Sequence, residues 1–424
     1  MRFSGFDDEW NEVKLGDIST FLDNKRIPLK EDDRKQIKGE YPYYGASGII
    51  DYVNDYIFDE ELILMGEDGA NIVTRSSKLI FLAKGKYWVN NHAHVIKADN
   101  NINQYFLSES LERINYEKYN TGTAQPKLNR EVCQKIKVKI PQFNEQNKIA
   151  NFLLVIDEKL RLLEQKYQYY QNFKKYLMQQ IFTQKLRFDF NDEWRIRILN
   201  EITFYQEGPG VRNYQYTKEG VKLLNVGNFV NNALELDNTD KYISNEEAYG
   251  KYKHFLVDEG DLLIACSGIK AEYFDEKIAF AENKHLPLCM NTSTMRFKSL
   301  DENTLNLRYL KYYFQTQSFK KQVFQVMTGS AQFNFGPTHL KYFKIPIPCL
   351  DEQIKIYQMF ESIDIKILNI YREIMKVKEF KKGLLQQMFI VRINWRCNFK
   401  LAKSPSFNKH LLILKNKIIF IIIE

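Results

Sequence analysis

The sequence predicts an α+β protein in which two globular domains are separated by a pair of long antiparallel coiled-coil helices, related by a pseudo-two-fold internal repeat. Three observations lead to this prediction. The chain has 424 residues, more than one ordinary hydrophobic core accommodates. Several of its segments occur twice, and heptad-spaced apolar residues follow in both copies. An apolar fraction of 44% is sufficient for two cores.

The repeated segments form two groups, called frames below, that differ in the number of residues between their two copies. Three segments recur at a shift of 207 residues: TGTAQ and TGSAQ (121–125 and 328–332), VKIPQFNEQNKI and IPIPCLDEQIKI (138–149 and 345–356), and FKKYLMQQIF and FKKGLLQQMF (173–182 and 380–389). The segments DEWNEVKLGDI (8–18) and DEWRIRILNEI (192–202) recur at a shift of 184 residues instead. Between these frames the two halves do not align, which indicates a tandem duplication with shared frames and unrelated interiors.

Each copy of the repeat ends in a segment with the heptad spacing of a coiled-coil helix. The apolar positions are Ile149, Leu153, Ile156, Leu160, Leu163, Tyr167, Tyr170, Leu177 and Ile181, and in the copy Ile356, Phe360, Ile363, Ile367, Ile370, Ile374, Val377, Leu384 and Met388. The one break in each pattern is a lysine, Lys174 or Lys381, at a core position, where a polar residue fixes helix register. Asn144 and Asp351 are the expected N-caps. Each helix should span about 39 residues, or about 58 Å at ~1.5 Å per residue.

The interiors of both halves predict mixed structure. Short β-rich runs interrupted by turn residues fill 41–97 and 255–299, and a helical stretch follows each of them. The predicted organisation is a first globular domain (1–143), a central helix (144–187), a second globular domain (188–350), a distal helix (351–390) and a basic, isoleucine-rich tail without order (391–424).

Composition and motifs favour a binding protein over an enzyme. The net charge of +8 lies mostly after Phe389, so it is weak support for nucleic-acid binding. Phosphate loops, dinucleotide fingerprints, zinc-protease motifs and the NPPF/Y-type motif of adenine methyltransferases do not occur. His92 and His94 could share a strand face and ligate a metal, but without a third ligand a structural or base-contacting role is the better interpretation. Cysteines without CxxC pairs and the lack of a long apolar run predict a cytoplasmic protein that does not enter the membrane.

The repeated EQ-x-K-I helices and TG(T/S)AQ turns, with unlike domains between them, resemble the specificity subunit of type I restriction-modification systems. The resemblance extends from residue 1 to about residue 390. Further strings are similar to those of its target recognition domains: YPYYGASGIIDYV, GEDGANI, AKGKYWVNNHAHV and TGTAQPKLN in the first half, and EGPGVRNYQYTKEGVKLLNV, HFLVDEGDLLIACSGIK, LPLCMNTSTMRFK and GSAQFNFGPTHL in the second.

The resemblance implies that each domain recognises one half of a split site in double-stranded DNA, with the helices setting the spacer. It also implies two modification subunits, which bring S-adenosylmethionine and adenine-N6 methylation, and two restriction subunits, which bring ATP- and Mg-dependent translocation and cleavage. The chain itself would be non-catalytic and hold no cofactor. The alternative is a coiled-coil DNA-binding or scaffold protein outside restriction, dimerising between chains.

Side chains suited to base edges or phosphates gather in the family-like strings. The DNA-contact candidates are Lys84, Lys86, Tyr87, Asn90, Asn91, His92 and Lys127 in the first domain, and Arg212, Tyr214, Gln215, Lys270, Asn291, Thr292 and Arg296 in the second. Gln125 and Gln332 occur in both frames, which favours a shared structural or phosphate-positioning role. The DNA sequence recognised and the spacer length cannot be predicted from these residues.

Overall fold

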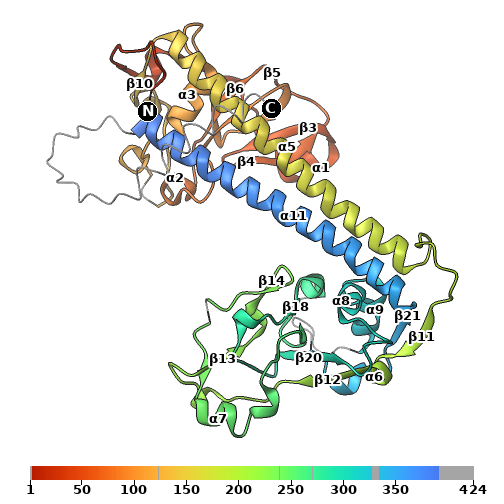
Figure 1. Cartoon of the computed structure of the whole chain (residues 1–424). Helices are drawn as coiled ribbons and strands as arrows, with labels where there is room; N and C mark the ends of the chain where they lie inside the picture. The colour runs from red at the N-terminus through yellow and green to blue at the C-terminus, as the bar shows by residue number, and fades with distance from the viewer. Residues whose placement is uncertain (1, 123, 238, 270, 327–333, 391–424) are drawn as a thin grey trace. The chain divides into compact units, whose positions relative to one another are not determined.

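The computed structural model describes residues 2–122, 124–237, 239–269, 271–326 and 334–390. It confirms the α+β class, with sheets and helices in both halves of the chain (Figure 1). Two compact units share the chain: unit 1 comprises Met1–Leu160 and the residues from Met375 on, and unit 2 comprises Arg161–Ile374. The basic tail predicted to lack order (391–424) lies outside the described residues.

Unit 1 contains two four-stranded sheets and one two-stranded ribbon. The first sheet has the order β2-β9-β6-β7 and the second β4-β3-β8-β5, while β1 pairs with β10. The strands are β1 (Asn11–Lys14), β2 (Ser19–Phe21), β3 (Lys38–Gly45), β4 (Gly48–Val53), β5 (Phe58–Asp59), β6 (Leu62–Gly66), β7 (Ile80–Ala83), β8 (Lys86–Val89), β9 (Ala93–Ala98) and β10 (Lys137–Ile140). The short helices are α1 (Glu31–Gln36), α2 (Asn71–Thr74), α3 (Gln104–Leu111) and α4 (Arg130–Gln134).

Unit 2 is built from a four-stranded sheet, a three-stranded sheet and two ribbons. Their orders are β12-β20-β17-β18, β16-β13-β19, β14-β15 and β11-β21. The strands are β11 (Arg195–Ile198), β12 (Thr203–Glu207), β13 (Val221–Leu224), β14 (Phe229–Val230), β15 (Ala233–Leu234), β16 (Tyr242–Ile243), β17 (Leu262–Ala265), β18 (Ile278–Phe280), β19 (Leu288–Met290), β20 (Thr294–Ser299) and β21 (Lys344–Ile347). The short helices are α6 (Leu199–Ile202), α7 (Asn245–Tyr249), α8 (Leu307–Phe314), α9 (Gln317–Val326) and α10 (Pro337–Leu340).

The interiors of the two halves have one topology, so the expectation of unrelated interiors is wrong. The orders β2-β9-β6-β7 and β12-β20-β17-β18 correspond strand for strand, and every pairing in them is antiparallel. Both second sheets contain one parallel pair, β3 with β8 and β13 with β19, although the first of these sheets has four strands and the second has three. Strands such as β6 and β17 are buried throughout. A buried strand requires only apolar residues of suitable size, so its fold survives the loss of sequence identity.

Two long helices follow the two domains: α5 (Phe143–Phe182, 40 residues) and α11 (Leu350–Leu385, 36 residues) (Figure 1). Both begin before the predicted caps: the amide of Gln146 donates to the carbonyl of Gln142 and that of Gln353 to the carbonyl of Cys349, so helical hydrogen bonds start ahead of Asn144 and Asp351. Helix α5 ends at Phe182 rather than near residue 187, since Gln184 adopts a left-handed conformation (φ 58°) and closes the helix. A π-helical turn (Gln386–Ile390) follows α11.

In unit 2 the part of α5 and the part of α11 that belong to this unit contact each other in antiparallel order. The ring centroids of Tyr167 and Tyr371 lie 6.0 Å apart, and further along α5 the ammonium of Lys174 lies 2.6 Å from the carboxylate of Asp364. In unit 1 the beginning of α5 packs with the end of α11, where Leu384 and Leu385 join the core that contains Leu153. Each domain therefore packs with part of both long helices.

A buried Glu-Gln pair at the start of each long helix explains the repeated EQ motif. The side chain of Gln353 donates to the carbonyls of Pro348 (3.0 Å) and Thr304 (2.9 Å), and accepts from the amide of Asn306 (2.9 Å). Asn306 is the N-cap of α8, so the glutamine connects the long helix to a helix of the domain. Gln146 makes the equivalent bonds to Pro141 and to Asn103, the N-cap of α3.

The glutamate of each pair binds an arginine that lies before the first strand of the same domain. Glu352 accepts two hydrogen bonds from the guanidinium of Arg187 (3.1 and 2.7 Å) and one from the indole of Trp194 (3.0 Å). Glu145 accepts two hydrogen bonds of 2.6 Å from Arg2. All four motif side chains are at most 1% exposed, which explains why both residue types occur in both copies.

The glutamine anchor can be tested with Gln353→Met, which keeps the volume but removes the amide. We expect the free energy of unfolding to fall by about 1–3 kcal/mol, because the amide of Asn306 and two carbonyls lose their buried partner. Exposed Gln317→Met in the same unit is the control and should change it little. Denaturant unfolding measures both variants, and equal stability of the two would contradict the anchor.

Candidate nucleic-acid interface

Three loops of the first domain are joined at one end of the sheet that contains β9 and β6. The amide of Glu67 donates to the carbonyl of His92 (2.9 Å), that of Leu128 to Glu67 (2.8 Å), and that of Gly69 to Pro126 (3.0 Å). These loops carry the strings GEDGAN, NNHAHV and TAQPKL. The backbone bonds thus bring together three segments that the sequence singled out separately.

Charged side chains connect the same loops. The guanidinium of Arg26 lies 2.7 Å from the carboxylate of Glu67, and the ammonium of Lys127 lies 3.4 Å from it. The imidazole of His92 lies 2.8 Å from the carboxylate of Asp68, with about half of the His92 side chain exposed. This set of alternating charges can offer both donors and acceptors to a ligand.

Five of the seven candidates in the first domain are exposed. Lys84 pairs with Glu61 at 2.6 Å, and the Lys86 ammonium lies 4.7 Å from the centre of the Tyr56 ring. Asn91 and His92 lie next to each other in the loop before β9, and Lys127 lies in the joined loop. Gln125 is exposed in that same loop. Asn91, His92 and Lys127 therefore share one surface.

Tyr87 and Asn90 are buried, which corrects their assignment as DNA contacts. Tyr87 is 0% exposed and its ring lies 5.5 Å from that of Phe58, in a core cluster of the first domain. Burial raises the pKa of its hydroxyl well above the usual range. Asn90, 5% exposed, accepts from the amide of His92 and so shapes the loop. Both residues support the surface without forming it.

His94 is a buried structural cation. Its two ring nitrogens lie 2.8 Å from the carboxylate of Asp23 and 2.8 Å from the carbonyl of Leu128. Both partners only accept hydrogen bonds, so both nitrogens must carry protons. Burial alone would lower the pKa of His94, but its interactions with Asp23 and Cys133 together outweigh burial and raise the pKa to about 10. His94 therefore ties the loop at Leu128 to the sheet and does not share a metal site with His92.

Four loops of the second domain meet in the corresponding place. The amide of Gly208 donates to Thr294 (3.0 Å), that of Thr292 to Pro209 (3.1 Å), that of Cys266 to Ser293 (2.9 Å) and that of Phe335 to Cys266 (3.0 Å). A Cβ on Gly208 would lie 2.4 Å from the carbonyl oxygen of Asn291, so glycine is needed for this close approach. These loops carry the second set of family-like strings.

The candidates of the second domain divide into exposed and buried groups. Tyr214 is 87% exposed, and Arg212 and Thr292 are also exposed. Gln215 is partly buried and donates to Glu247 (2.6 Å) and to the hydroxyl of Tyr252 (3.0 Å). Lys270 and Gln332 lie outside the described residues.

Arg296 and Asn291 are both 7% exposed, which corrects their assignment as DNA contacts. The guanidinium of Arg296 donates to the carbonyls of His254 and Leu256, both at 2.7 Å, and to the side chain of Gln206. The side-chain amide of Asn291 donates to the side-chain carbonyl of Asn225 (3.0 Å). Because these polar groups are used within the domain, the two residues hold the loops in place.

Lys174 and Lys381 occupy equivalent ion pairs. Lys174 contacts Asp364 (2.6 Å), the side chain of Gln315 (3.2 Å) and the face of the Tyr312 ring (5.3 Å from its centre). Lys381 pairs with Asp157 and lies 3.7 Å from Glu109. A shift of 207 residues relates both members of the two pairs. Each pair joins one long helix to the other within its unit.

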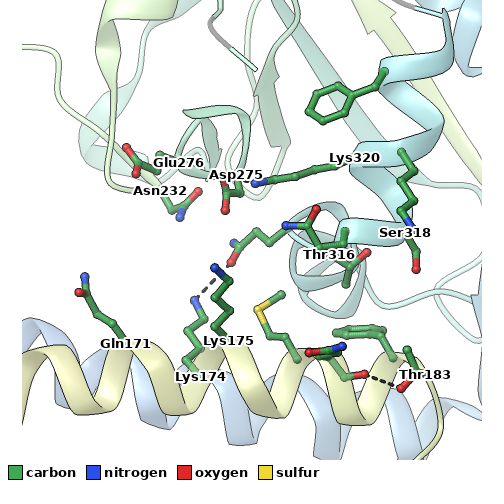
Figure 2. Close-up of a pocket in the computed structure, with 17 residues that line it drawn as sticks. Gln171, Lys174, Lys175, Thr183, Asn232, Asp275, Glu276, Thr316, Ser318 and Lys320 are labelled. Atoms are coloured by element: carbon green, nitrogen blue, oxygen red, sulfur yellow. Dashed lines mark hydrogen bonds and ion pairs between the residues drawn. The ribbon is translucent and has the colours of Figure 1, made fainter. Parts of the chain in front are cut away.

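A pocket of about 830 Å³ lies beside Lys174, between the second half of α5 and the residues around the start of α9 (Figure 2). Lys174, Lys175 and Lys320 are among its lining residues, and Lys320 extends toward Asp275, 2.6 Å away. Lys174 and Lys320 thus both have partners within unit 2. We interpret this pocket as part of the packing between the helix and the domain.

Two carboxylates of the first-domain surface, Glu67 and Asp68, were not among the sequence candidates. Only the contacts of Glu67 and Asp68 with Arg26, His92 and Lys127 identify them as part of this group of charges. Among the residues that the structure describes, no cluster of three or more His, Cys, Asp or Glu side chains could hold a metal ion. No described helix combines the length and apolarity needed to span a membrane.

Comparison with known proteins gives consistent matches over most of the chain. The family model of the type I restriction modification DNA specificity domain matches twice, at residues 7–169 and 191–379. A putative type I restriction enzyme specificity subunit of Haemophilus influenzae is 27% identical over 379 residues, covering 85% of this chain and 88% of that protein. The type I restriction enzyme MjaVIII specificity subunit of Methanocaldococcus jannaschii is 23% identical over 412 residues, covering 91% and 93%.

A solved structure shows a similar fold. The crystal structure of a type I restriction-modification S subunit from M. genitalium matches with a TM-score of 0.60 and 14% identity, covering 91% of this chain and 96% of that one. At this identity the match is informative about the fold.

The role of His94 can be tested by comparing His94→Gln with His92→Gln. We expect His94→Gln to lower the free energy of unfolding by about 3–5 kcal/mol, because Asp23 loses its buried cation. The exposed His92 pair should contribute only about 0–1 kcal/mol. Because the pKa of His94 is raised from 6.5 to about 10, the stability difference from wild type should be complete below pH 6.5 and shrink as the pH rises through 10. Denaturant titrations across this range would contradict the account if the two variants behaved alike.

Proposed function

The chain belongs to the type I restriction modification DNA specificity family, and from this premise we propose that it is the sequence-specific DNA-binding specificity subunit of a type I restriction-modification complex. Each recognition domain binds one half of a bipartite site. The observation that carries the proposal is the repeated topology with different loops, because two unlike half-sites require two unlike surfaces in equivalent positions. The exposed side chains Asn91 and His92 in one domain and Arg212 and Tyr214 in the other are suited to this task.

The helices α5 and α11 set the distance between the half-sites in this proposal. Half-sites one turn of DNA apart are separated by about 34–36 Å. A 40-residue helix extends about 60 Å at ~1.5 Å per residue, which is long enough for a spacer on that scale. The Lys-Asp pairs in both units support a fixed helix register.

Partner subunits supply the chemistry. We propose that two modification subunits dock on the helical regions with S-adenosylmethionine and methylate adenine N6. Two restriction subunits add the ATP- and Mg-dependent translocase and nuclease. The chain itself contributes recognition without catalysis and acts in the cytoplasm. A scaffold role outside restriction is not favoured, because the named relatives are specificity subunits over most of the chain.

The function is tested by sequencing methylated DNA from the host with and without this gene. We expect a bipartite N6-methyladenine motif that disappears when the gene is deleted and returns on complementation. A methylome in which no bipartite motif depends on the gene would contradict the proposal. In the purified complex, one chain should assemble with two modification subunits, whereas the alternative scaffold would pair its helices between two copies of the chain.

The spacer role predicts an effect of replacing both register lysines, Lys174→Leu and Lys381→Leu. Leucine at a core position should keep or raise the stability of the helix pair, while loss of the two ion pairs allows other registers. We expect the complex to accept DNA with spacers one base pair longer or shorter, measured as affinity for a duplex series. The neighbouring exposed lysines, changed as Lys175→Leu and Lys382→Leu, provide the control. An unchanged spacer preference in the first double variant would count against this role.

A further inference from the structure

Asp23 of the first domain and Glu207 of the second occupy equivalent positions. Phe21 pairs with Ile96 in the first sheet, and Tyr205 pairs with Phe297 in the second. This fixes the shift between strands β2 and β12 at 184 residues, the same shift that relates the DEW segments. Two residues further on, the shift relates Asp23 to Glu207. The two carboxylates therefore stand at corresponding edges of the two corresponding sheets.

The two carboxylates have different surroundings. Asp23 binds the imidazolium of His94 and the amide of Val95, and lies 3.7 Å from Arg26. The strand pairing relates His94 to Met295, because Met65 pairs with His94 and Ile264 with Met295. Glu207 pairs with Met295 in the ladder, and methionine cannot supply a cation or a strong donor.

The carboxylate of Glu207 has no hydrogen bond or ion pair with any residue that the structure describes, although Glu207 is partly buried. Burial raises the pKa of its carboxyl group. A desolvated carboxylate without a donor destabilises the folded state, so such a group is commonly found where a ligand supplies the donor. Gly336 stands beside it, since a Cβ there would lie 3.6 Å from Oε2 of Glu207.

The place of Glu207 connects it to the recognition surface. It directly precedes Gly208 and Pro209, which are bonded to the strand and loop at 292–294. Ser267 and Gly268 donate to the side chain of Asn334 (2.6 and 3.0 Å), which joins the two remaining loops next to it. The carboxylate thus lies where the four loops of the second domain meet.

We propose that Glu207 is a specificity-determining residue that accepts a hydrogen bond from the exocyclic amino group of a base, with cytosine N4 as the matching donor. Phosphate groups are excluded as its ligand because they carry the same charge. Cytosine N4 and adenine N6 are the amino donors in the major groove, and carboxylates pair with cytosine N4. This inference rests on the proposed function. It assigns the Glu207 carboxylate, which has no partner among the described residues, a role that the paired Asp23 of the first domain cannot have.

The test compares the assembled complex carrying Glu207→Gln with wild type on duplexes that contain the bipartite site and all single base-pair substitutions in it. We expect wild type to discriminate at every position of both half-sites. The variant should lose about 5- to 100-fold of discrimination at one position of a single half-site, where wild type requires cytosine. It should bind non-cognate duplexes equally or more tightly, because a negative charge near the phosphates is removed.

Glu302→Gln is the control, since Glu302 is exposed in a turn before α8 and should leave the whole profile unchanged. Uniform weakening on every duplex would show a structural role and overturn the inference. An unchanged base preference combined with weaker subunit assembly would overturn it in favour of a protein contact. If wild type itself preferred no sequence, the proposed function would fail and this inference with it.

Discussion

A buried glutamine fixes each recognition domain to the long helix that follows it. Gln146 and Gln353 each satisfy the carbonyl of a proline at the start of their own helix and the N-cap amide of a helix in the domain. The neighbouring glutamate binds an arginine that lies before the first strand of the same domain. Because these groups are buried and paired, the domain has little freedom to turn on its helix, and its loops are presented in a defined direction.

The same scaffold carries two different surfaces, since the sheet needs only apolar residues while the loops are free to vary. The pair His94–Asp23 and its counterparts Met295 and Glu207 show how this works. In the first domain the carboxylate is used for internal stability, and in the second it has no partner among the residues that the structure describes. In the proposed role of Glu207, the loss of one buried cation leaves a carboxylate available to bind a base.

The sequence predicted the repeat, both long helices and the α+β class, because these depend on identity at a constant shift and on heptad spacing. It predicted helix starts less well, since the helical hydrogen bonds already begin at the carbonyls of Gln142 and Cys349, ahead of the expected caps Asn144 and Asp351. Four site candidates, Tyr87, Asn90, Asn291 and Arg296, proved to be buried. Their polar groups are equally suited to bases and to loop carbonyls, and only the strand pairing decides between the two. The topology shared by the interiors left no alignable residues and so could not be predicted.

The central claim, that each domain contacts its own half of a bipartite site, is tested most directly by site-specific photocrosslinking in the assembled complex. A photoreactive side chain replaces exposed Asn91 in one sample and exposed Tyr214 in another, and the crosslinked bases are mapped on a duplex with the methylated motif. The account predicts that the two positions crosslink to opposite half-sites and that no crosslink forms in the spacer. Crosslinks from both positions to the same half-site would contradict it.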